Sequence, residues 1–476
     1  MSLLRSLFPP TVLTIGFAAS LSVWCAWFLT HLPWLGLSEM VAKPVVLGVW
    51  LGALMIGAVL LRRAGRTGGE TTFATAAAGL ISASLGLLIL GSKLTEPAGA
   101  AASMTPAELR PHAALMTLGF LVLGGVLGLV GAGLAALTTG VRRVAIDSQS
   151  DDALWIGRFG VVAAASLVPL LVIGGLVTST NSGMAVPDWP NTFGSNMFLY
   201  PLGPRAAPDV FLEHSHRLFG ALIGLTAIAL TFLTFIHPRA HALRVWAVVL
   251  LVLVIVQGTL GGLRVRLGAT DFASDDKFYR VIHGVLAQVV FALFVVVAVL
   301  LSPLYQSVRD RVRRGELAFL EGGLSPRMFR IFANAALHTT FLQLIFGALY
   351  RHTRQPHALW THIGFSVVVL VLALVAASAA TSVRPDDARA RTTLSRWGIL
   401  AASCVFLQFA LGWVAFIVGG SSHQAESIPQ ALIRTSHQAN GALLVAILTV
   451  LAVWSKMLAP KVASLAVPQA RLAPGA

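Results

Sequence analysis

Four histidines recur at regular intervals in the C-terminal two thirds of the chain, each about one helical turn inside the start of an apolar run. They are His216, His283, His362 and His437, separated by 67, 79 and 75 residues. Imidazole is the commonest metal ligand among side chains, and facing helices of a bundle can hold a cofactor between such ligands. The spacing therefore predicts two bis-histidine pairs of the kind that ligate heme iron.

The elements that carry these histidines are predicted to cross a membrane. Of the 476 residues, 56% are apolar and 11% are charged, against about 25% charged in soluble domains. Each apolar run is long enough to span about 30 Å of hydrocarbon. We expect an all-α integral membrane protein of about 12 transmembrane helices, at residues 11–31, 44–62, 72–93, 112–138, 155–178, 212–236, 243–263, 281–301, 330–350, 359–381, 395–418 and 433–455.

The distribution of basic residues predicts the orientation. Lys and Arg accumulate in the cytoplasmic loops of membrane proteins. With the N-terminus inside, the inner segments hold 22 of the 34 Lys and Arg that produce the net charge of +15. This bias predicts a multi-pass protein with both termini cytoplasmic and all four histidines near the outer face, and we expect it in the bacterial cell membrane. A nucleic-acid partner is excluded, because no soluble basic domain is present.

An internal repeat divides the chain. The polar stretch RRVAIDSQSDD separates four N-terminal spans from eight C-terminal ones, and the eight consist of a two-helix unit repeated four times. In three units a glutamine (Gln257, Gln343 or Gln408) precedes the Gly-rich end of the first helix. We expect a four-span region of unknown role at 1–150, a first four-helix bundle at 151–310 and a second at 311–476, the two bundles being related by a pseudo-twofold axis.

The repeat also predicts how the histidines pair. Two hairpins make one four-helix bundle, so the first bundle supplies His216 with His283 and the second supplies His362 with His437. Each bundle could then hold one porphyrin between facing helices.

One carboxylate distinguishes the two pairs. Glu213 precedes His216 by three residues, which places both on one helix face, whereas the equivalent positions are Arg280, Leu359 and Arg434. A glutamate beside an iron ligand could act as a general acid or base, or could stabilise developing positive charge. The alternative is an interfacial glutamate that forms an ion pair with Arg217.

Arginines gather at the outer ends of these helices. Heme carries two propionates, and Arg is the favoured partner of a carboxylate at a wet interface. Candidate propionate ligands are Arg217, Arg351 and Arg434, while some of the outer arginines are expected to be ordinary interfacial anchors.

The histidine segments resemble a known family. EHSHRLFG, IHGVLAQ, THIGFS and SHQANGALL are similar to the histidine motifs of the heme A synthase family, and the loop TNSGMAVPDWPNTFG resembles its Gly-Ser-Gly and Pro-Asp-Trp-Pro segment. The resemblance covers residues from about 155 to 455. The chain departs from the family in two places. Thr178 or Ser179 stands where the family frequently has an Arg, and the loop around Val186 and Pro187 lacks the cysteine pair that many bacterial members carry.

The resemblance implies an oxidoreductase that converts the C8 methyl of heme O to a formyl group, making heme A for terminal oxidases. It implies a prosthetic heme b ligated by His362 and His437. His216 and His283 would flank the substrate heme, with Glu213 as the catalytically important acid. Implied partners are heme O and heme A, the lipid bilayer, a heme O synthase, oxidase assembly factors and an electron donor, and a homo-oligomer is left open.

Two other functions remain compatible with the residues. The first is a bis-heme electron-transfer cytochrome, which would use the same histidine pairs without producing heme A. The second is a secondary transporter, because twelve spans with internal repeats occur in that class. Transporter sites usually lie near the bilayer midplane, whereas these histidines are predicted to lie near the outer face.

Overall fold

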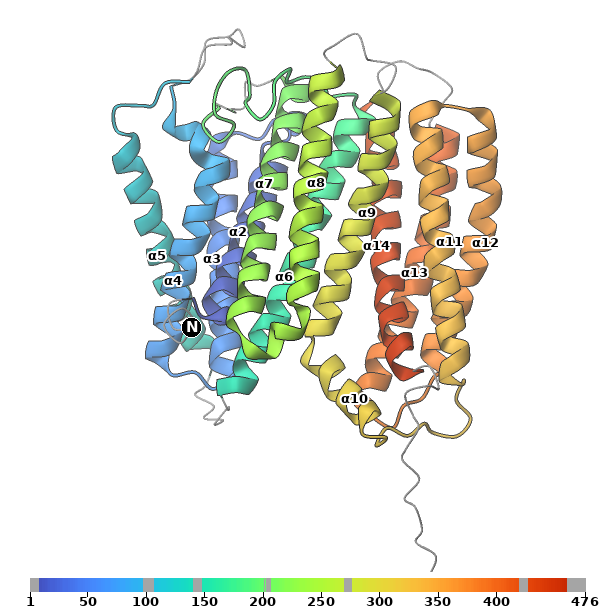
Figure 1. The fold of residues 1–476 in the computed structure, drawn as a ribbon. Coiled ribbons are helices and arrows are strands. Elements are labelled where there is room, and N and C mark those ends of the chain that lie inside the picture. The colour runs from blue at the N-terminus through green and yellow to red at the C-terminus, as the bar shows by residue number, and fades with distance from the viewer. Residues whose placement is uncertain are drawn as a thin grey trace, which may run out of the picture.

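The computed structural model describes residues 8–96, 107–139, 148–200, 202, 207–268, 276–418 and 427–459. The orientation was predicted from the basic residues of the inner segments. Five of these residues lie outside the described ranges: Arg5, Arg142, Arg143, Lys461 and Arg471. The described elements are all helical (Figure 1): α2 Pro10–Thr30, α3 Glu39–Arg63, α4 Gly68–Leu90, η1 Gly91–Leu94, α5 Ala113–Thr138, α6 Ser148–Ser179, α7 Pro208–Ile236, η2 Pro238–Leu243, α8 Arg244–Gly268, α9 Asp276–Leu301, α10 Pro303–Arg313, α11 Pro326–Thr353, α12 Pro356–Ser382, α13 Ala388–Val418 and α14 Ile428–Leu458.

Twelve of these helices are long and apolar enough to cross a membrane. Each overlaps a predicted span, with boundaries that agree to within seven residues, so the prediction of an all-α, multi-pass membrane protein is confirmed. Helices suit this environment because they satisfy every backbone hydrogen bond within the segment. The short α10 is the exception among the helices after η2, since it is amphipathic and buries Tyr305 and Val308 while carrying Arg311 and Arg313.

Prolines determine where several spans begin. Pro208, Pro326 and Pro356 occupy the first turn of α7, α11 and α12, and Pro429 that of α14. Proline has no N–H to leave unpaired at that position, and its φ already suits a helix. The starts of α7, α12 and α14 are therefore defined locally, which sets how far inside each helix its histidine lies.

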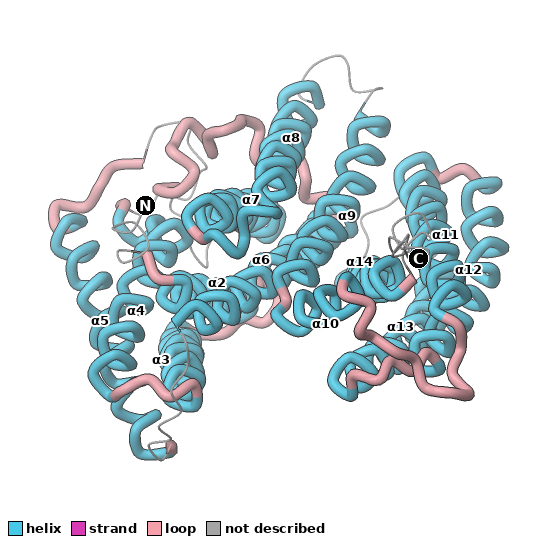
Figure 2. The backbone as a smooth tube through the Cα atoms, turned by 60° about the horizontal axis from the view of Figure 1, so that its bottom comes forward, coloured by secondary structure: helices cyan, strands magenta, loops and turns pink. Residues whose placement is uncertain are grey.

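The eight C-terminal helices form two groups of four. Helix α6 contacts α7 and α9, and α8 contacts both of these, which closes the first ring. Contacts of α12 with α11 and α13, and of α14 with α13 and α11, close the second. The groups lie side by side through α6, α9, α11 and α14 (Figure 2). The pseudo-twofold relation stays a prediction, and the boundaries proposed at 150 and 310 fall inside α6 and α10.

Helices α2 to α5 flank the first group. Helix α2 packs against α6 and α7, and Arg66 pairs with Asp151 near the start of α6. Helices α4 and α5 approach closely, because a Cβ added to Gly79 would lie 2.0 Å from the carbonyl oxygen of Gly124. Small residues permit such backbone contact between membrane helices. The N-terminal helices thus form a packed layer beside the first four-helix group.

Candidate functional site

All four repeated histidines line one cavity of about 1090 Å³ within the C-terminal eight helices. They lie 8, 7, 6 and 9 residues after the first residues of α7, α9, α12 and α14. Those four helices begin at the same end of the molecule (Figure 1). At 1.5 Å per residue the histidines are about 9–14 Å along their helices. The structure therefore brings all four together at one level.

Each imidazole lies against a glycine of the preceding helix. A Cβ added to these glycines would lie about 3 Å from the Cε1 atom of the facing histidine, which is too close for an unshifted ring. The pairs are Gly174 with His216 at 3.0 Å, Gly261 with His283 at 3.2 Å, Gly347 with His362 at 2.9 Å and Gly412 with His437 at 3.1 Å. The four hairpins thus share one glycine seat for one imidazole.

Three of the four histidines are also contacted, at the imidazole or at the main-chain carbonyl, by the side-chain amide of a glutamine one turn before the glycine. Nε2 of Gln257 donates to the His283 carbonyl at 2.8 Å and lies 3.1 Å from its Nδ1. Nε2 of Gln343 donates to the His362 carbonyl at 2.8 Å. Nε2 of Gln408 lies 3.2 Å from Nδ1 of His437, and its Oε1 accepts from Nδ2 of Asn440 at 2.8 Å. In the first hairpin the same position is Leu170.

The rings of the second pair face each other across the cavity. The ring centroids of His362 and His437 are 6.2 Å apart, and the ring planes are inclined by 85°. Two metal–imidazole bonds of about 2.0–2.1 Å each would take up about 4 Å of that separation, and the two half rings the remainder. The second pair, with its glycine seats, therefore has the dimensions of a bis-histidine heme site.

Each oxygen of the Glu213 carboxylate accepts a hydrogen bond from a neighbouring group. Its Oε1 accepts from Nη2 of Arg217 at 2.7 Å and its Oε2 accepts from the backbone N–H of Val186 at 2.9 Å. Both side chains are less than a tenth exposed. The ion pair that the sequence left as an alternative therefore forms, and Glu213 also lines the cavity.

Arg217 connects α7 to the loop that follows α6. Its Nη1 donates to the carbonyls of Asp188 at 2.6 Å and Asn191 at 2.9 Å, and its Nη2 donates to the carbonyl of Val186 at 3.0 Å. With the bond to Glu213, both terminal nitrogens are used. The geometry thus gives Arg217 a loop-holding role, and the predicted contact with a propionate stays a prediction.

The same loop is packed over the first pair. A Cβ on Gly262 would lie 2.3 Å from ring atoms of Trp189, so this indole lies directly on α8 beside the seat of His283. The carboxylate of Asp188 accepts from the backbone N–H groups of Phe193 and Gly194, each at 2.8 Å, which closes the turn. Trp189 and Pro190 line the cavity, so the loop forms its wall at this end.

His214 is excluded as a cavity ligand by its direction. It is 1% exposed, its Nδ1 lies 3.1 Å from Oγ1 of Thr192, and its ring packs against Tyr200. It does not line the cavity. As the two-residue spacing from His216 predicts, His214 faces the loop instead.

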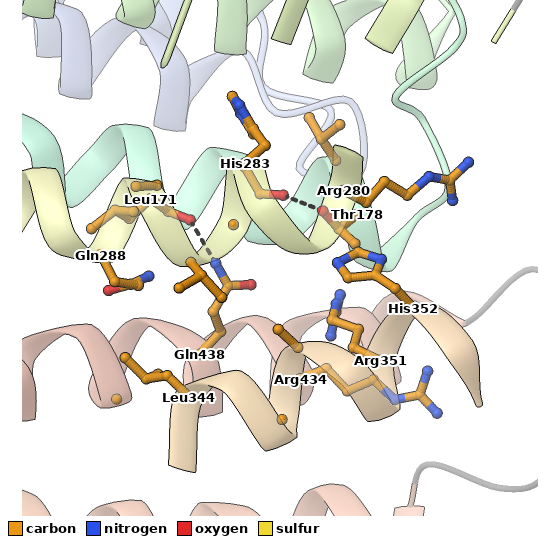
Figure 3. A pocket seen from close by; sticks show the side chains of 18 of the residues that line it. Leu171, Thr178, Arg280, His283, Gln288, Leu344, Arg351, His352, Arg434 and Gln438 are labelled. Atoms are coloured by element: carbon orange, nitrogen blue, oxygen red, sulfur yellow. Dashed lines mark hydrogen bonds between the residues drawn. The ribbon is translucent and has the colours of Figure 1, made fainter. Parts of the chain in front are cut away.

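One end of the cavity is strongly basic. Glu213 is the only carboxylate among the described residues that line it, against Arg217, Arg264, Arg280, Arg351, Arg354 and Arg434. Figure 3 shows Arg280 of α9, Arg351 and His352 of α11 and Arg434 of α14 grouped at that end. Such a surface favours an anionic ligand, because Arg binds carboxylates through charged hydrogen bonds. The predicted propionate candidates Arg351 and Arg434 both lie here.

Arg351 also joins the two helix groups. Its Nη2 donates to Oγ of Ser179 at 2.6 Å, and that hydroxyl lies 3.2 Å from Oγ1 of Thr435. Ser179 is one of the two positions at which the resembling family frequently has an arginine and this chain does not. In the fold, Arg351 of the second helix group contacts Ser179, a contact that the sequence alone does not predict.

Sequence reasoning missed the glycine seats and the residues that flank them. The sequence did contain a signal, because a glycine follows each of the three repeated glutamines by four residues. That spacing alone is equally typical of close packing between membrane helices, so the contacts of these glycines with the imidazoles are visible only in the fold.

The fold and site define a multi-pass membrane protein in which paired histidines face a common cavity, the arrangement of a heme-ligand site. Residues 157–364 match the family model described as cytochrome oxidase assembly protein. The heme A synthase of Lysinibacillus sphaericus is 26% identical over 282 residues, which cover 54% of this chain and 84% of that protein. The heme A synthase of Shouchella clausii is 32% identical over 116 residues, 24% of this chain and 37% of its own.

A third relative, the heme A synthase of Bradyrhizobium diazoefficiens, is 27% identical over 232 residues, which cover 42% of this chain and 58% of that protein. The chain therefore spans less than two thirds of the Shouchella and Bradyrhizobium relatives. No solved structure matches the chain significantly. The chain is thus similar to heme A synthases, and the family model covers residues 157–364 of it.

Proposed function

We propose that this protein is a heme A synthase that oxidises the C8 methyl of heme O to a formyl group. The observation that carries the proposal is a single cavity with two histidine pairs on glycine seats, of which only the first has a carboxylate beside it. Two similar histidine pairs with different surroundings are consistent with one site that retains a heme and one site at which the substrate heme reacts. The relatives support the choice of reaction, because they are heme A synthases.

The second pair is the proposed holding site for heme b. His362 and His437 face each other at a ligating separation, and Nδ1 of His362 lies 3.2 Å from the backbone carbonyl oxygen of Gln343. Ligating histidines are typically oriented by such outer partners. Arg351 and Arg434 at the same end of the cavity are the proposed propionate ligands.

The first pair is the proposed reaction site. His216 and His283 would flank the substrate heme, whose iron supplies the redox chemistry when bound. Glu213, one turn before His216, would keep a negative charge beside the reacting edge and take or return a proton at a carboxylate oxygen. Arg217 would hold Glu213 in place, and Trp189 would help to exclude water from this end of the cavity.

The proposed role of residues 1–150 is to support the loop over the reaction site. The backbone N–H of Ala107 donates to Oγ of Ser195 at 2.9 Å, and a Cβ on Gly91 would lie 2.2 Å from the Phe198 carbonyl oxygen. Phe28 of α2 stacks on Phe211 of α7, and the ring of Trp27 packs against Phe211 at a tilt. The N-terminal layer is therefore well placed to hold α7 and its loop against the first pair.

The remaining parts of the proposal concern location and partners. We propose a bacterial cell membrane protein with cytoplasmic termini and the histidines near the outer face, following the basic-residue bias. Heme O would arrive from a heme O synthase, electrons would enter from a separate donor, and product would pass to oxidase assembly factors. Each of these partners rests on the proposed reaction and on the similarity to heme A synthases.

A bis-heme electron-transfer cytochrome is the second candidate. It is favoured by the observation that both oxygens of Glu213 already accept hydrogen bonds, which is what a purely structural glutamate would show. A secondary transporter is less well supported, because the histidines and arginines meet in one cavity near one end of the helices rather than at their middle.

Coexpression with a heme O producer tests the proposal. Pigments extracted from the purified protein would be identified by mass, with His283→Ala as the matched control that keeps the second pair. A heme A synthase should yield heme A in the wild type and none in the control. Bound heme with no heme A would favour the cytochrome, and a preparation without Soret absorption would favour the transporter.

A further inference from the structure

We infer that Arg264 binds a propionate of the heme held by the first pair and thereby fixes which edge of that heme lies near Glu213. The inference rests on the proposed function, because it names a substrate contact of the proposed reaction site. Its basis is the distribution of the arginines that line the cavity and the loop that contacts one of them.

Arg264 is the cavity-lining arginine that lies at the first pair. It belongs to α8 and is partly buried. Its guanidinium is near enough to interact electrostatically with the imidazoles of both His216 and His283. In the second pair, Arg351 has the same relation to His437. Each histidine pair therefore has an arginine beside it.

The neighbouring arginines of the cavity are placed differently. Both terminal nitrogens of Arg217 already donate to the loop carbonyls and to the adjacent carboxylate. Figure 3 shows Arg280 grouped with Arg351 and Arg434. Arg264 is thus the arginine placed to receive a carboxylate at the first pair, and its planar guanidinium suits that partner because it can donate two parallel hydrogen bonds.

One loop segment contacts both Arg264 and Glu213. A Cβ added to Gly183 would lie 2.8 Å from Nη1 and 2.9 Å from Nη2 of Arg264, so the guanidinium lies directly against this backbone. Three residues later in the loop, the backbone N–H of Val186 donates to Oε2 of Glu213 at 2.9 Å. The cation and the carboxylate of the first pair are therefore positioned by the same short segment.

This arrangement suits the structure of the proposed substrate. In heme O, the pyrrole ring that bears the C8 methyl also bears one of the two propionates. A cation that binds this propionate therefore fixes the position of the methyl on the same ring. Such orientation matters to the rate, because a misplacement of about 1 Å can cost about 10²-fold. Arg264 would orient the substrate heme, and Glu213 would handle the proton.

The test compares hemin with hemin dimethyl ester, in which both propionates are uncharged. The full-length chain with His362→Ala and His437→Ala leaves only the first pair for the added ligand, and binding would be followed by absorbance. Arg264→Gln should weaken hemin binding about 10–100-fold, as is typical for hydrogen bonds to charged groups, and leave ester binding unchanged. Arg266→Gln is the matched control and should bind both ligands as its parent does, because Arg266 is an exposed residue of the same helix that does not line the cavity.

Equal hemin affinity in Arg264→Gln and its parent would overturn the inference. An equal loss of affinity for hemin and for the ester would also overturn it, because the effect would then be structural. If Arg264→Gln does not accumulate, Gly183→Ala decides. Its Cβ would displace the guanidinium and should weaken the binding of hemin but not of the ester, and unchanged hemin affinity would contradict the proposed contact.

Heme A production by the wild type is measured separately. A loss of affinity specific to hemin, without any heme A, would retain the carboxylate contact and reject the synthase. Heme A production together with equal hemin affinities would retain the synthase and reject the role of Arg264.

Discussion

Glu213 and Arg217 form a buried ion pair with 2.7 Å between Oε1 and Nη2, and the same two residues hold the loop over the first histidine pair. The pair thus couples the only carboxylate of the described cavity lining to the loop that forms the cavity wall. Because this carboxylate has a structural task as well as the catalytic task proposed for it, substitutions must separate the two.

Glu213→Gln should preserve the shape of the site while removing the charge. The amide oxygen can still accept from the Val186 N–H, so the loop and the heme b of the second pair should be retained. General acid–base catalysis typically contributes about 10²–10⁴-fold, and heme A formation should fall by about that factor. Heme b content and heme A yield would be measured on one preparation. Full activity would show that the carboxylate serves only the loop.

Arg217→Gln should destabilise the protein more than Glu213→Gln. Breaking a buried ion pair from one side leaves an uncompensated charge and typically costs about 3–5 kcal/mol. Here three loop carbonyls also lose their donor. Thermal unfolding in detergent would measure the difference. The double variant should recover part of the loss, and strict additivity of the two single changes would argue against a coupled pair.

Replacement of either ligand of the second pair should abolish tightly held heme b. His362→Ala and His437→Ala each remove one of the two facing imidazoles, whereas His216→Ala leaves that pair intact. Heme content per protein after purification would distinguish them. Normal heme b in His437→Ala would contradict the assignment of the holding site.

Gly347→Ala should weaken heme b binding through steric displacement of His362. The added Cβ would lie 2.9 Å from Cε1 of the imidazole, and overpacking of this kind typically costs about 1–3 kcal/mol. Gly364→Ala is the matched control, because it lies in the histidine's own helix with nothing within 4 Å of its added Cβ. Equal hemin affinity of the two variants would show that the glycine seat is not needed.

Gly91→Ala should impair the reaction site from the N-terminal layer. The added Cβ would lie 2.2 Å from the Phe198 carbonyl oxygen, so η1 and the loop would have to separate. We expect slower heme A formation with normal heme b content. Gly69→Ala, with open space around its added Cβ, is the control. An unaffected rate in Gly91→Ala would remove the support for a loop-holding role of this region.

The twelve spans followed from the sequence because membrane helices are determined locally. About twenty apolar residues suffice to cross the hydrocarbon, and no partner helix is needed to satisfy the backbone. The common level of the four histidines could be predicted for the same reason, since the distance of a residue from the start of its helix depends on that segment alone. The one-face relation of Glu213 and His216 also followed from helical periodicity alone.

Contacts between helices could not be predicted from the sequence, because they depend on which helix faces pack against each other. The tertiary structure decided three such contacts. Glu213 bonds to both Val186 and Arg217, Arg351 of one helix group bonds to Ser179 of the other, and four particular glycines lie against the four imidazoles. Leu170 illustrates the difference: in the sequence it is one apolar residue among many, and only the packing of α6 against α7 reveals that it replaces a repeated amide.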